Sequence, residues 1–262
     1  MDANPAATRL WPAAVSIAVL SGMLLGVPAH ASAEQKTSER IDRTIPFSPG
    51  GLLKLKNFSG DIRITASNEE QVVITAIRRG TRERLDEVKL SIEAEPRQIT
   101  INANQREGWW PRRKSQVVET EFEITVPART ELDVNAFASD IRVVGVEDRQ
   151  TLHTFSGGIT VRDASGPLEA KTFSGDVHLE LRDGVQSPDL DVKTFSGDIT
   201  ARVGGNASAQ VRFNSFSGGL RSDLPLLLES GNRRNLTARL NQGGGTELYF
   251  KTFSGDVRIV RE

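Results

Sequence analysis

Apolar and polar residues alternate through most of the chain after residue 50. Leu168, Ala170 and Thr172 form one run of alternate positions, and Val177 and Leu179 form the next. Alternation with a period of two predicts β-strands that bury one face. The two runs have opposite parity, so a straight strand would turn one of them outward. We therefore expect the chain to bend between Thr172 and Val177, where a Ser-Gly pair lies.

The expected bend belongs to a motif that recurs along the chain. Seven of the eleven phenylalanines occupy one motif position, and these are Phe58, Phe137, Phe155, Phe173, Phe195, Phe216 and Phe253. A glycine follows two residues later in six of the motifs, at Gly60, Gly157, Gly175, Gly197, Gly218 and Gly255. From the second motif onward the next four phenylalanines come after 18, 18, 22 and 21 residues. This spacing is too short for a four-stranded propeller blade and fits one coil of a β-solenoid.

The pattern predicts an all-β fold, a single β-solenoid domain over residues 34–262 with coils of about 18–22 residues. The repeat coils occupy residues 131–262. Residues 34–130 keep the alternation but mostly lack the motif, so we expect longer strands that cap the N-terminal end of the solenoid. The 37 residues from Phe216 to Phe253 are expected to hold about two coils, one of them degenerate.

Stacked coils would bring the motif phenylalanines together as a phenylalanine ladder, with Phe216 following Phe195. Inside the core, each ring would contribute ~2–3 kcal/mol through burial. On that interpretation Phe173→Ala would cost ~3–5 kcal/mol. We expect the ladder in the core, because a contiguous aromatic stripe is unusual on the surface of a soluble monomer. The alternative is an exposed stripe used for binding.

The first 33 residues have the order of a secretory signal peptide. An apolar stretch from Trp11 to Val27 is followed by proline and by two A-x-A sites. The mature chain is therefore expected to begin at Ser32 or Glu34, in the periplasm, on the cell surface or in the medium. The stretch is short for a membrane anchor, which is the alternative. We expect no membrane span after cleavage.

Composition removes several classes of function. The chain has no cysteine, which excludes disulfides, thiolate metal sites, thiol catalysis and a lipidated N-terminal cysteine. The formal net charge is −1, so no strong field favours nucleic acid or an anionic membrane. We expect no cofactor and no nucleic-acid partner.

Two columns of polar residues accompany the motif. The carboxylates of Asp140, Asp176, Asp198 and Asp256 would stack about 4.8 Å apart and invite calcium binding or acid–base chemistry. Because Gly158 and Gly219 interrupt this column, we interpret the aspartates as polar turn residues. The motif serines have no base at a matching offset, since His153 and His178 stand at different offsets. No catalytic residue and no metal site is predicted.

A compact aromatic and basic segment lies outside the repeats. It contains Trp109, Trp110, Arg112 and Arg113. Such a segment is typical of loops that bind carbohydrate, an anionic polymer or a protein, and these four residues are the candidate binding site. The alternative is a hairpin tip whose charges are simply solvated.

Coils of the form Thr-x-Ser-Gly-Asp-Ile, a strand that ends at Val126-Pro127, and a closing segment from Lys251 to Ile259 resemble the bacterial "putative-adhesin" family of unknown function. The resemblance covers nearly all of residues 45–262. It implies a β-helix-like fold, a cell-envelope setting and no enzyme activity. This chain departs from the family in its uniform phenylalanines and in Gly158 and Gly219.

Together these features predict a non-catalytic exported protein of the cell envelope, an adhesin or an interaction scaffold. Its expected partner is an envelope protein or a polysaccharide. The alternative is a lyase or hydrolase that acts on polysaccharide, because β-helices also carry such enzymes. A cleft with converging carboxylates would distinguish the enzyme from the scaffold, and the fold alone would not.

Overall fold

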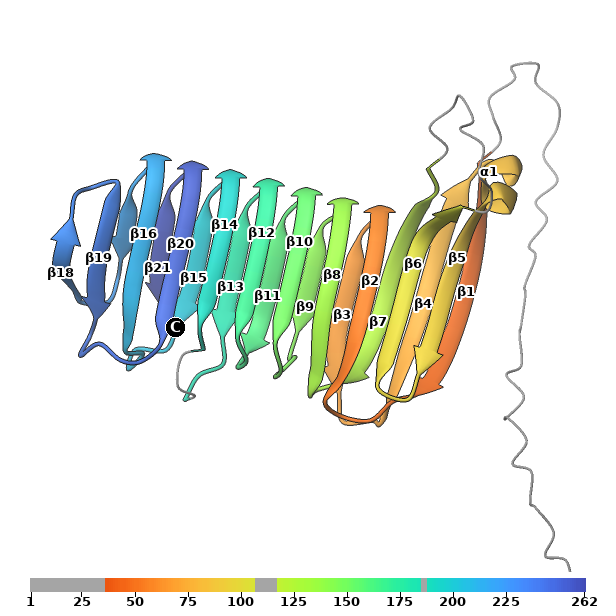
Figure 1. Ribbon diagram of the computed structural model, residues 1–262, viewed down its shortest axis with the longest axis horizontal. Coiled ribbons are helices and arrows are strands. Elements are labelled where there is room, and N and C mark those ends of the chain that lie inside the picture. The colour runs from red at the N-terminus through yellow and green to blue at the C-terminus, as the bar shows by residue number, and fades with distance from the viewer. Residues whose placement is uncertain (1–35, 107–116, 185–187) are drawn as a thin grey trace, which may run out of the picture.

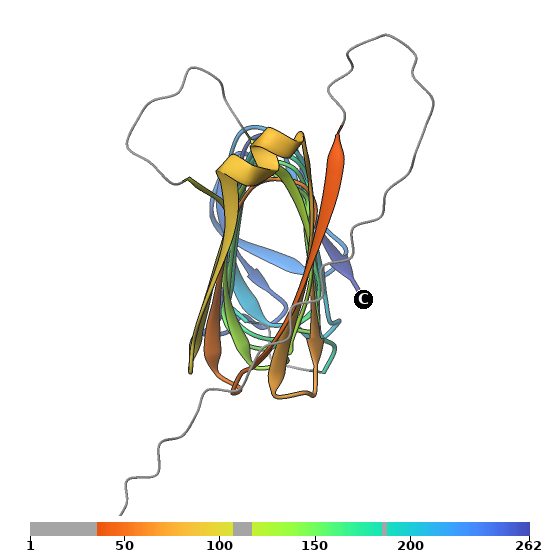
Figure 2. The same ribbon diagram turned by 90° about the vertical axis from the view of Figure 1, so that its right-hand side faces the viewer.

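The computed structural model describes residues 36–106, 117–184 and 188–262, which form two sheets facing each other across one core (Figures 1 and 2). In spatial order the first sheet has β1 (Thr37–Pro46), β4 (Gln71–Gly80), β7 (Glu119–Pro127), β3 (Ile62–Ser67), β9 (Ile141–Val144), β11 (Ile159–Ala164), β13 (Val177–Leu181), β15 (Ile199–Val203), β21 (Val257–Arg261) and β17 (Leu220–Ser222). The second has β18 (Leu226–Gly231), β19 (Asn235–Leu240), β16 (Ala209–Ser217), β20 (Glu247–Ser254), β14 (Leu190–Ser196), β12 (Leu168–Ser174), β10 (Gln150–Ser156), β8 (Thr130–Ala138), β2 (Gly51–Ser59), β6 (Gln98–Arg106) and β5 (Val88–Glu95).

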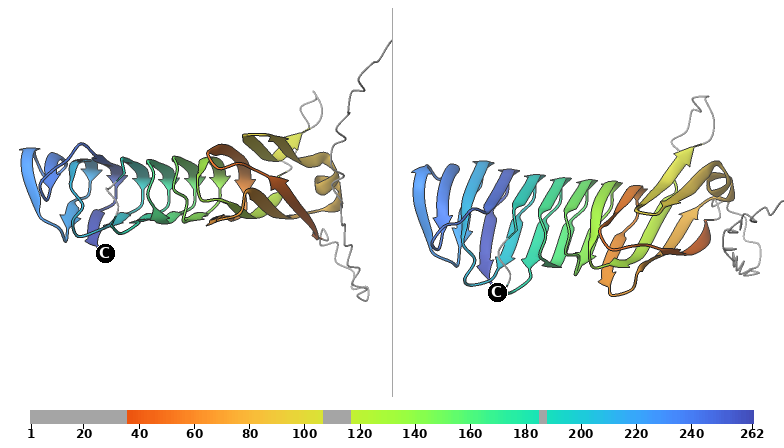
Figure 3. Two further views of the ribbon diagram at one scale, coloured as in Figure 1. Left: turned by 90° about the horizontal axis from the view of Figure 1, so that it is seen from below. Right: turned by 60° about the horizontal axis from the view of Figure 1, so that its bottom comes forward.

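Each repeat coil contributes one strand to each sheet, and the motif forms the corner between them. In the coil of β12 and β13, Leu168 and Ala170 point inward before the corner, and Val177 and Leu179 point inward after it. The predicted bend is therefore present. Neighbouring coils pair in parallel, so that Thr172 is level with its counterparts in β10 and β14. The result is an all-β, solenoid-like stack that forms a straight row (Figure 3).

The corner requires glycine for two reasons. Gly175 has a φ of +150°, a conformation that L side chains rarely adopt. In addition, a Cβ at Gly175 would lie 2.1 Å from the carbonyl oxygen of Gly157 in the preceding coil. The repeated Ser-Gly pair is thus explained by the close approach of consecutive backbones at the corner.

The chain does not follow spatial order at the N-terminal end. β2 pairs with β8 and β3 pairs with β9, so the first and second motif coils are direct neighbours. The strands between them in sequence lie beyond the first coil, with β6 and β5 in the second sheet and β7 and β4 in the first, where β1, which precedes the first coil in sequence, forms the outer edge. A short helix, α1 (Arg82–Glu87), packs Leu85 against Val88 and Val118 at this end (Figure 1).

The C-terminal end also departs from chain order, and here two expectations are wrong. The last coil, β20 and β21, lies between the coil of β14 and β15 and the coil of β16 and β17. The segment between Phe216 and Phe253 forms the β18–β19 hairpin, which pairs antiparallel with β16, and not two coils. Consequently Phe253 stands between Phe195 and Phe216. The reason for the two errors is that every coil carries the same alternation, so the pattern contains no information on which coil is the neighbour of which.

Candidate functional site

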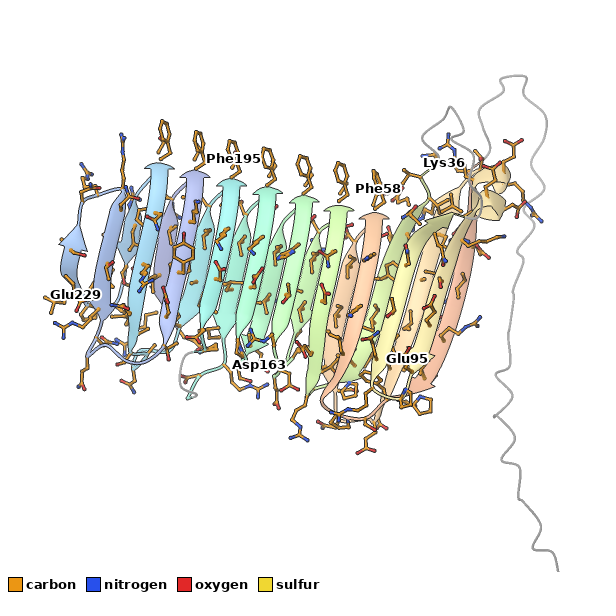
Figure 4. All side chains as sticks on the ribbon, viewed as in Figure 1. Lys36, Phe58, Glu95, Asp163, Phe195 and Glu229 are labelled. Atoms are coloured by element: carbon orange, nitrogen blue, oxygen red, sulfur yellow. The ribbon has the colours of Figure 1, made fainter. Side chains whose placement is uncertain are left out.

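The phenylalanine ladder lies on the surface, and its predicted place in the core is wrong. The seven motif rings are between 39% and 62% exposed and stand along one edge of the solenoid, where Figure 4 labels Phe58 and Phe195. The four remaining phenylalanines, Phe47, Phe122, Phe213 and Phe250, are buried. The cost of 3–5 kcal/mol for Phe173→Ala rested on a buried ring and no longer applies.

Strand parity explains why the rings point outward. Thr172 is 6% exposed and faces the core, so the next residue, Phe173, must face the other side. The Thr172 hydroxyl donates a hydrogen bond to the Gly157 carbonyl oxygen at 3.0 Å, which fixes the threonine in the inward position. The inward parity of Leu168, Ala170 and Thr172 was visible in the sequence, and it is the signal that places the ring outside.

Neighbouring rings stack face to face. Their centroids are 4.6–4.9 Å apart with interplanar angles of 2–19°. Each internal ring therefore covers the faces of its neighbours and presents mainly its edge to solvent. At 150–250 Å² for a phenylalanine side chain, the exposed part of the ladder amounts to about 600 Å². That equals the largest apolar patches of typical monomers, which are often functional.

Charged rows of opposite sign flank the ladder. Two residues before the rings, on the second sheet, is the lysine row of Lys56, Lys171, Lys193 and Lys251. Three residues after the rings, toward the first sheet, is the aspartate row of Asp61, Asp140, Asp176, Asp198 and Asp256. The ladder is thus an apolar strip bordered by lysines on one side and by aspartates on the other. Both borders also carry counter-charges, since Lys171 and Lys193 are paired with Glu169 and Asp191, and Arg142 is paired with Asp61 and Asp140.

The aspartate row holds neighbouring coils together. Asp176 Oδ1 accepts the backbone N–H of Asp198 at 2.8 Å, and Asp198 Oδ1 accepts that of Asp256 at 2.8 Å. Asp140 and Asp256 accept from Gly158 and Gly219, each at 2.9 Å. The glycines that interrupt the row are therefore donors to it. The turn interpretation of the aspartates accounts for these bonds, and over the described residues no three His, Asp or Glu side chains gather as metal ligands.

A family comparison agrees with this geometry. The family model described as Toastrack DUF4097 matches residues 130–260. The chain belongs to this Toastrack family. The matched segment runs from the second motif coil to the last strand and so contains six of the seven ladder rings. The resemblance to an adhesin-like family of unknown function, seen in the sequence, is supported at this level.

Solved structures resemble this chain at low sequence identity. A "putative cell adhesion protein" from Clostridium sporogenes ATCC 15579 is 11% identical, with a TM-score of 0.51, and the match covers 87% of this chain and all of that chain. A "putative adhesin" from Bacteroides fragilis NCTC 9343 is 10% identical, with a TM-score of 0.44, and the match covers 84% of this chain and 97% of that chain. Among curated proteins, none matches the sequence.

The remaining sequence candidates lie at the border of the ladder, in the first sheet or outside the described residues. In the Toastrack chain His153 contacts Glu169 at 2.8 Å across β10 and β12, and His178 is on β13 in the other sheet. The candidate binding residues Trp109, Trp110, Arg112 and Arg113 lie outside the described residues, as does the expected signal peptide, and both stay predictions. In the part of the chain that the structure describes, no helix is long and apolar enough to cross a membrane.

A pocket of about 390 Å³ lies at the N-terminal end of the ladder, beside Phe58. Its lining includes Arg79 and Glu119. Arg79 forms an ion pair with Glu121 and lowers the pKa of that carboxyl, chiefly through their hydrogen bonds. Glu121 is therefore charged at neutral pH and is a poor general acid. The exposure of the ladder rings is the surface feature of the Toastrack chain that the packing of the fold explains least.

Proposed function

We propose that this Toastrack protein is a non-catalytic, exported interaction protein of the cell envelope, adhesive or scaffolding in role, that binds through the phenylalanine ladder. The proposal includes removal of residues 1–33 as a signal peptide and a single domain over residues 34–262. The observation that carries it is the exposure of seven aligned rings while the other four phenylalanines fill the core. The fold does not require exposed aromatic rings along this edge, whereas an exposed apolar surface is typical of a binding site.

The repeated aspartates favour a binding role for the protein over a catalytic role. The Oδ1 atoms of the aspartates that would serve as acid–base pairs accept hydrogen bonds from backbone N–H groups of the next coil. They recur at one offset in coil after coil, as expected of a structural requirement, whereas an active site is singular. A partner in the envelope, protein or polysaccharide, is consistent with the description of the Clostridium sporogenes protein of similar fold as a "putative cell adhesion protein".

Retention on cell-envelope fragments tests the proposal. The mature chain is compared with the triple variant Phe155→Ser, Phe173→Ser and Phe195→Ser by cosedimentation with isolated membranes and with peptidoglycan sacculi. We expect at least tenfold weaker retention of the variant, because the ladder loses its apolar centre. The matched control is Leu227→Ser with Leu228→Ser, two leucines that are 57% and 58% exposed on β18, away from the ladder.

Two results would contradict the proposal. One is equal retention of the ladder variant and the control, with both folded by circular dichroism. The other is turnover of a polysaccharide by the mature chain that Asp176→Asn abolishes without unfolding it, which would restore the lyase or hydrolase alternative.

A further inference from the structure

The ladder's shape and charge restrict what can cover it. Sugar rings bind aromatic side chains through the ring faces, but here each internal ring has its faces covered by neighbours 4.6–4.9 Å away. An anionic membrane attracts a basic surface, but the border on the first sheet carries five aspartates. On the other border, Glu169 and Asp191 lie beside Lys171 and Lys193 and lower the positive potential that a membrane would meet. The remaining candidate partner is a protein surface that has a straight apolar strip with complementary charged borders.

We propose that the partner of the ladder is the ladder of a second copy of this chain, the two copies lying parallel and in register. This rests on the proposed function, because it takes the ladder as the interaction surface. The second ladder has the same length, about 28 Å over six ring spacings, and the same straightness. A two-fold axis parallel to the row of coils would bring each ring to the edge of its own counterpart, as an isologous interface requires.

The area is sufficient for a stable pair. Each ladder exposes about 600 Å² of phenylalanine, so ladder-to-ladder contact would bury about 1,200 Å² before the borders are counted. A specific interface needs roughly 1,000 Å² or more, and the standard range begins near 1,200 Å². The proposed interface is apolar and aromatic along its centre and charged at its rim, which is the usual arrangement.

The charged borders select the parallel orientation. In an antiparallel pair the aspartate row of one copy would lie on the same side as the aspartate row of the other. Asp176 would then face its own counterpart and Asp140 would face Asp256, and these carboxylates would repel. In a parallel pair the aspartate row of one copy lies on the side of the partner's lysine row. In register, Asp61, Asp176, Asp198 and Asp256 would each face a lysine position of the partner that holds lysine, whereas Asp140 would face Asn135. Where glycine replaces aspartate, at Gly158 and Gly219, the lysine position holds His153 and Asn214.

A parallel pair has a consequence for binding. Both copies place the β1–β7 end of the solenoid at the same end of the dimer. Any ligand site at that end is then presented twice, side by side, and binding to a repetitive envelope surface gains from the high effective concentration of the second site.

Sedimentation velocity of the purified mature chain tests self-association, with no envelope present. We expect the mass to rise to twice that of the monomer with increasing concentration. The Phe155→Ser, Phe173→Ser, Phe195→Ser variant should dimerise at least tenfold more weakly, whereas the Leu227→Ser, Leu228→Ser control should match the wild type. A wild-type chain that stays monomeric throughout, or a variant that dimerises equally, overturns the proposal. So does a monomer that binds phosphatidylglycerol vesicles through the ladder.

Single cysteines test the orientation, because the chain has none of its own. Phe58→Cys and Phe216→Cys place a thiol at opposite ends of the ladder. In the parallel pair, each variant alone should form a disulfide-linked dimer under mild oxidation. If only the mixture of the two variants crosslinks, the pair is antiparallel and the proposed arrangement is wrong.

The two proposals fail separately. If the wild type is monomeric but the ladder variant still loses retention on envelope fragments, self-pairing is wrong and the proposed function stands. If the pair forms and the ladder variant is retained on the envelope as well as the control, self-pairing stands and envelope binding through the ladder is wrong.

Discussion

At the corner of each coil, threonine and aspartate side chains form hydrogen bonds with backbone groups, and glycine leaves space for the neighbouring backbone. In the coil of β12 and β13, the hydroxyl of Thr172 donates to the carbonyl oxygen of Gly157, and Asp176 accepts the N–H of Asp198. Gly175 leaves room for the preceding backbone. Phe173 makes none of these bonds and has 45% of its surface exposed. The corner therefore accounts for threonine, glycine and aspartate, but not for the exposed phenylalanine, for which we propose a binding role.

Replacement of the corner glycine should be far more costly than replacement of its neighbour. Gly175→Ala places a Cβ 2.1 Å from the Gly157 carbonyl oxygen and at a φ of +150°, so we expect a loss of at least about 2 kcal/mol in unfolding free energy. Ser174→Ala changes an exposed side chain and should cost within about 0.5 kcal/mol. Urea titration of both variants measures the difference, and equal midpoints would show that the corner tolerates a side chain.

At the scale of the strands, ion pairs on the outer face of the second sheet join neighbouring coils. Glu169 on β12 contacts His153 on β10 at 2.8 Å and is also paired with Lys171 on its own strand. The pKa of Glu169 is lowered, first by the hydrogen bond from Lys171, with a smaller contribution from His153. Because a lowered pKa means that the folded state favours the charged carboxylate, this cluster stabilises the strand pair when Glu169 is ionised.

The pH dependence of stability should report this cluster. The contribution of Glu169 is fully present above the pKa of the unfolded carboxyl, about 4.3, and is lost as the pH falls through the lower folded value. Glu169→Gln should therefore be slightly less stable than wild type at pH 7, and the difference should be smaller at pH 3. Urea unfolding at both pH values checks this, with Glu131→Gln, an exposed position on β8, as the control. A difference that persists at low pH would point to lost packing.

At the scale of the whole molecule, the two ends of the solenoid are closed by strands that interrupt chain order. The last coil of the sequence lies one position inside the end, and the β18–β19 hairpin lies at the end. An unpaired parallel edge is a template for aggregation, so an antiparallel hairpin at this position protects the stack. In this arrangement β16 reaches the rest of the second sheet through β20 alone.

Truncation tests this dependence. Removal of residues 246–262 deletes β20 and β21, so β16, β18 and β19 lose their connection to β14. We expect protease cleavage throughout residues 209–245 of the truncated chain, with the coils up to β14 still protected. A second variant, with residues 226–240 replaced by a flexible linker, keeps β20 and should keep β16 protected. Limited proteolysis with mass spectrometry distinguishes the two, and protection of β16 in the truncated chain would contradict the topology.

The coil can be predicted from the amino-acid sequence alone, because alternation and the Ser-Gly corner are short-range features. The parity that turns Phe173 outward next to inward Thr172 is also visible there, but the general expectation that aromatic residues are buried pointed the other way. Which coils are neighbours is visible only in the folded chain. Parallel pairing depends on backbone hydrogen bonds and on matching alternation, which every coil shares, so nothing local distinguishes Phe253 from Phe216 as the neighbour of Phe195. Long-range pairing at the two ends selects that order, and with it a continuous ladder of seven rings.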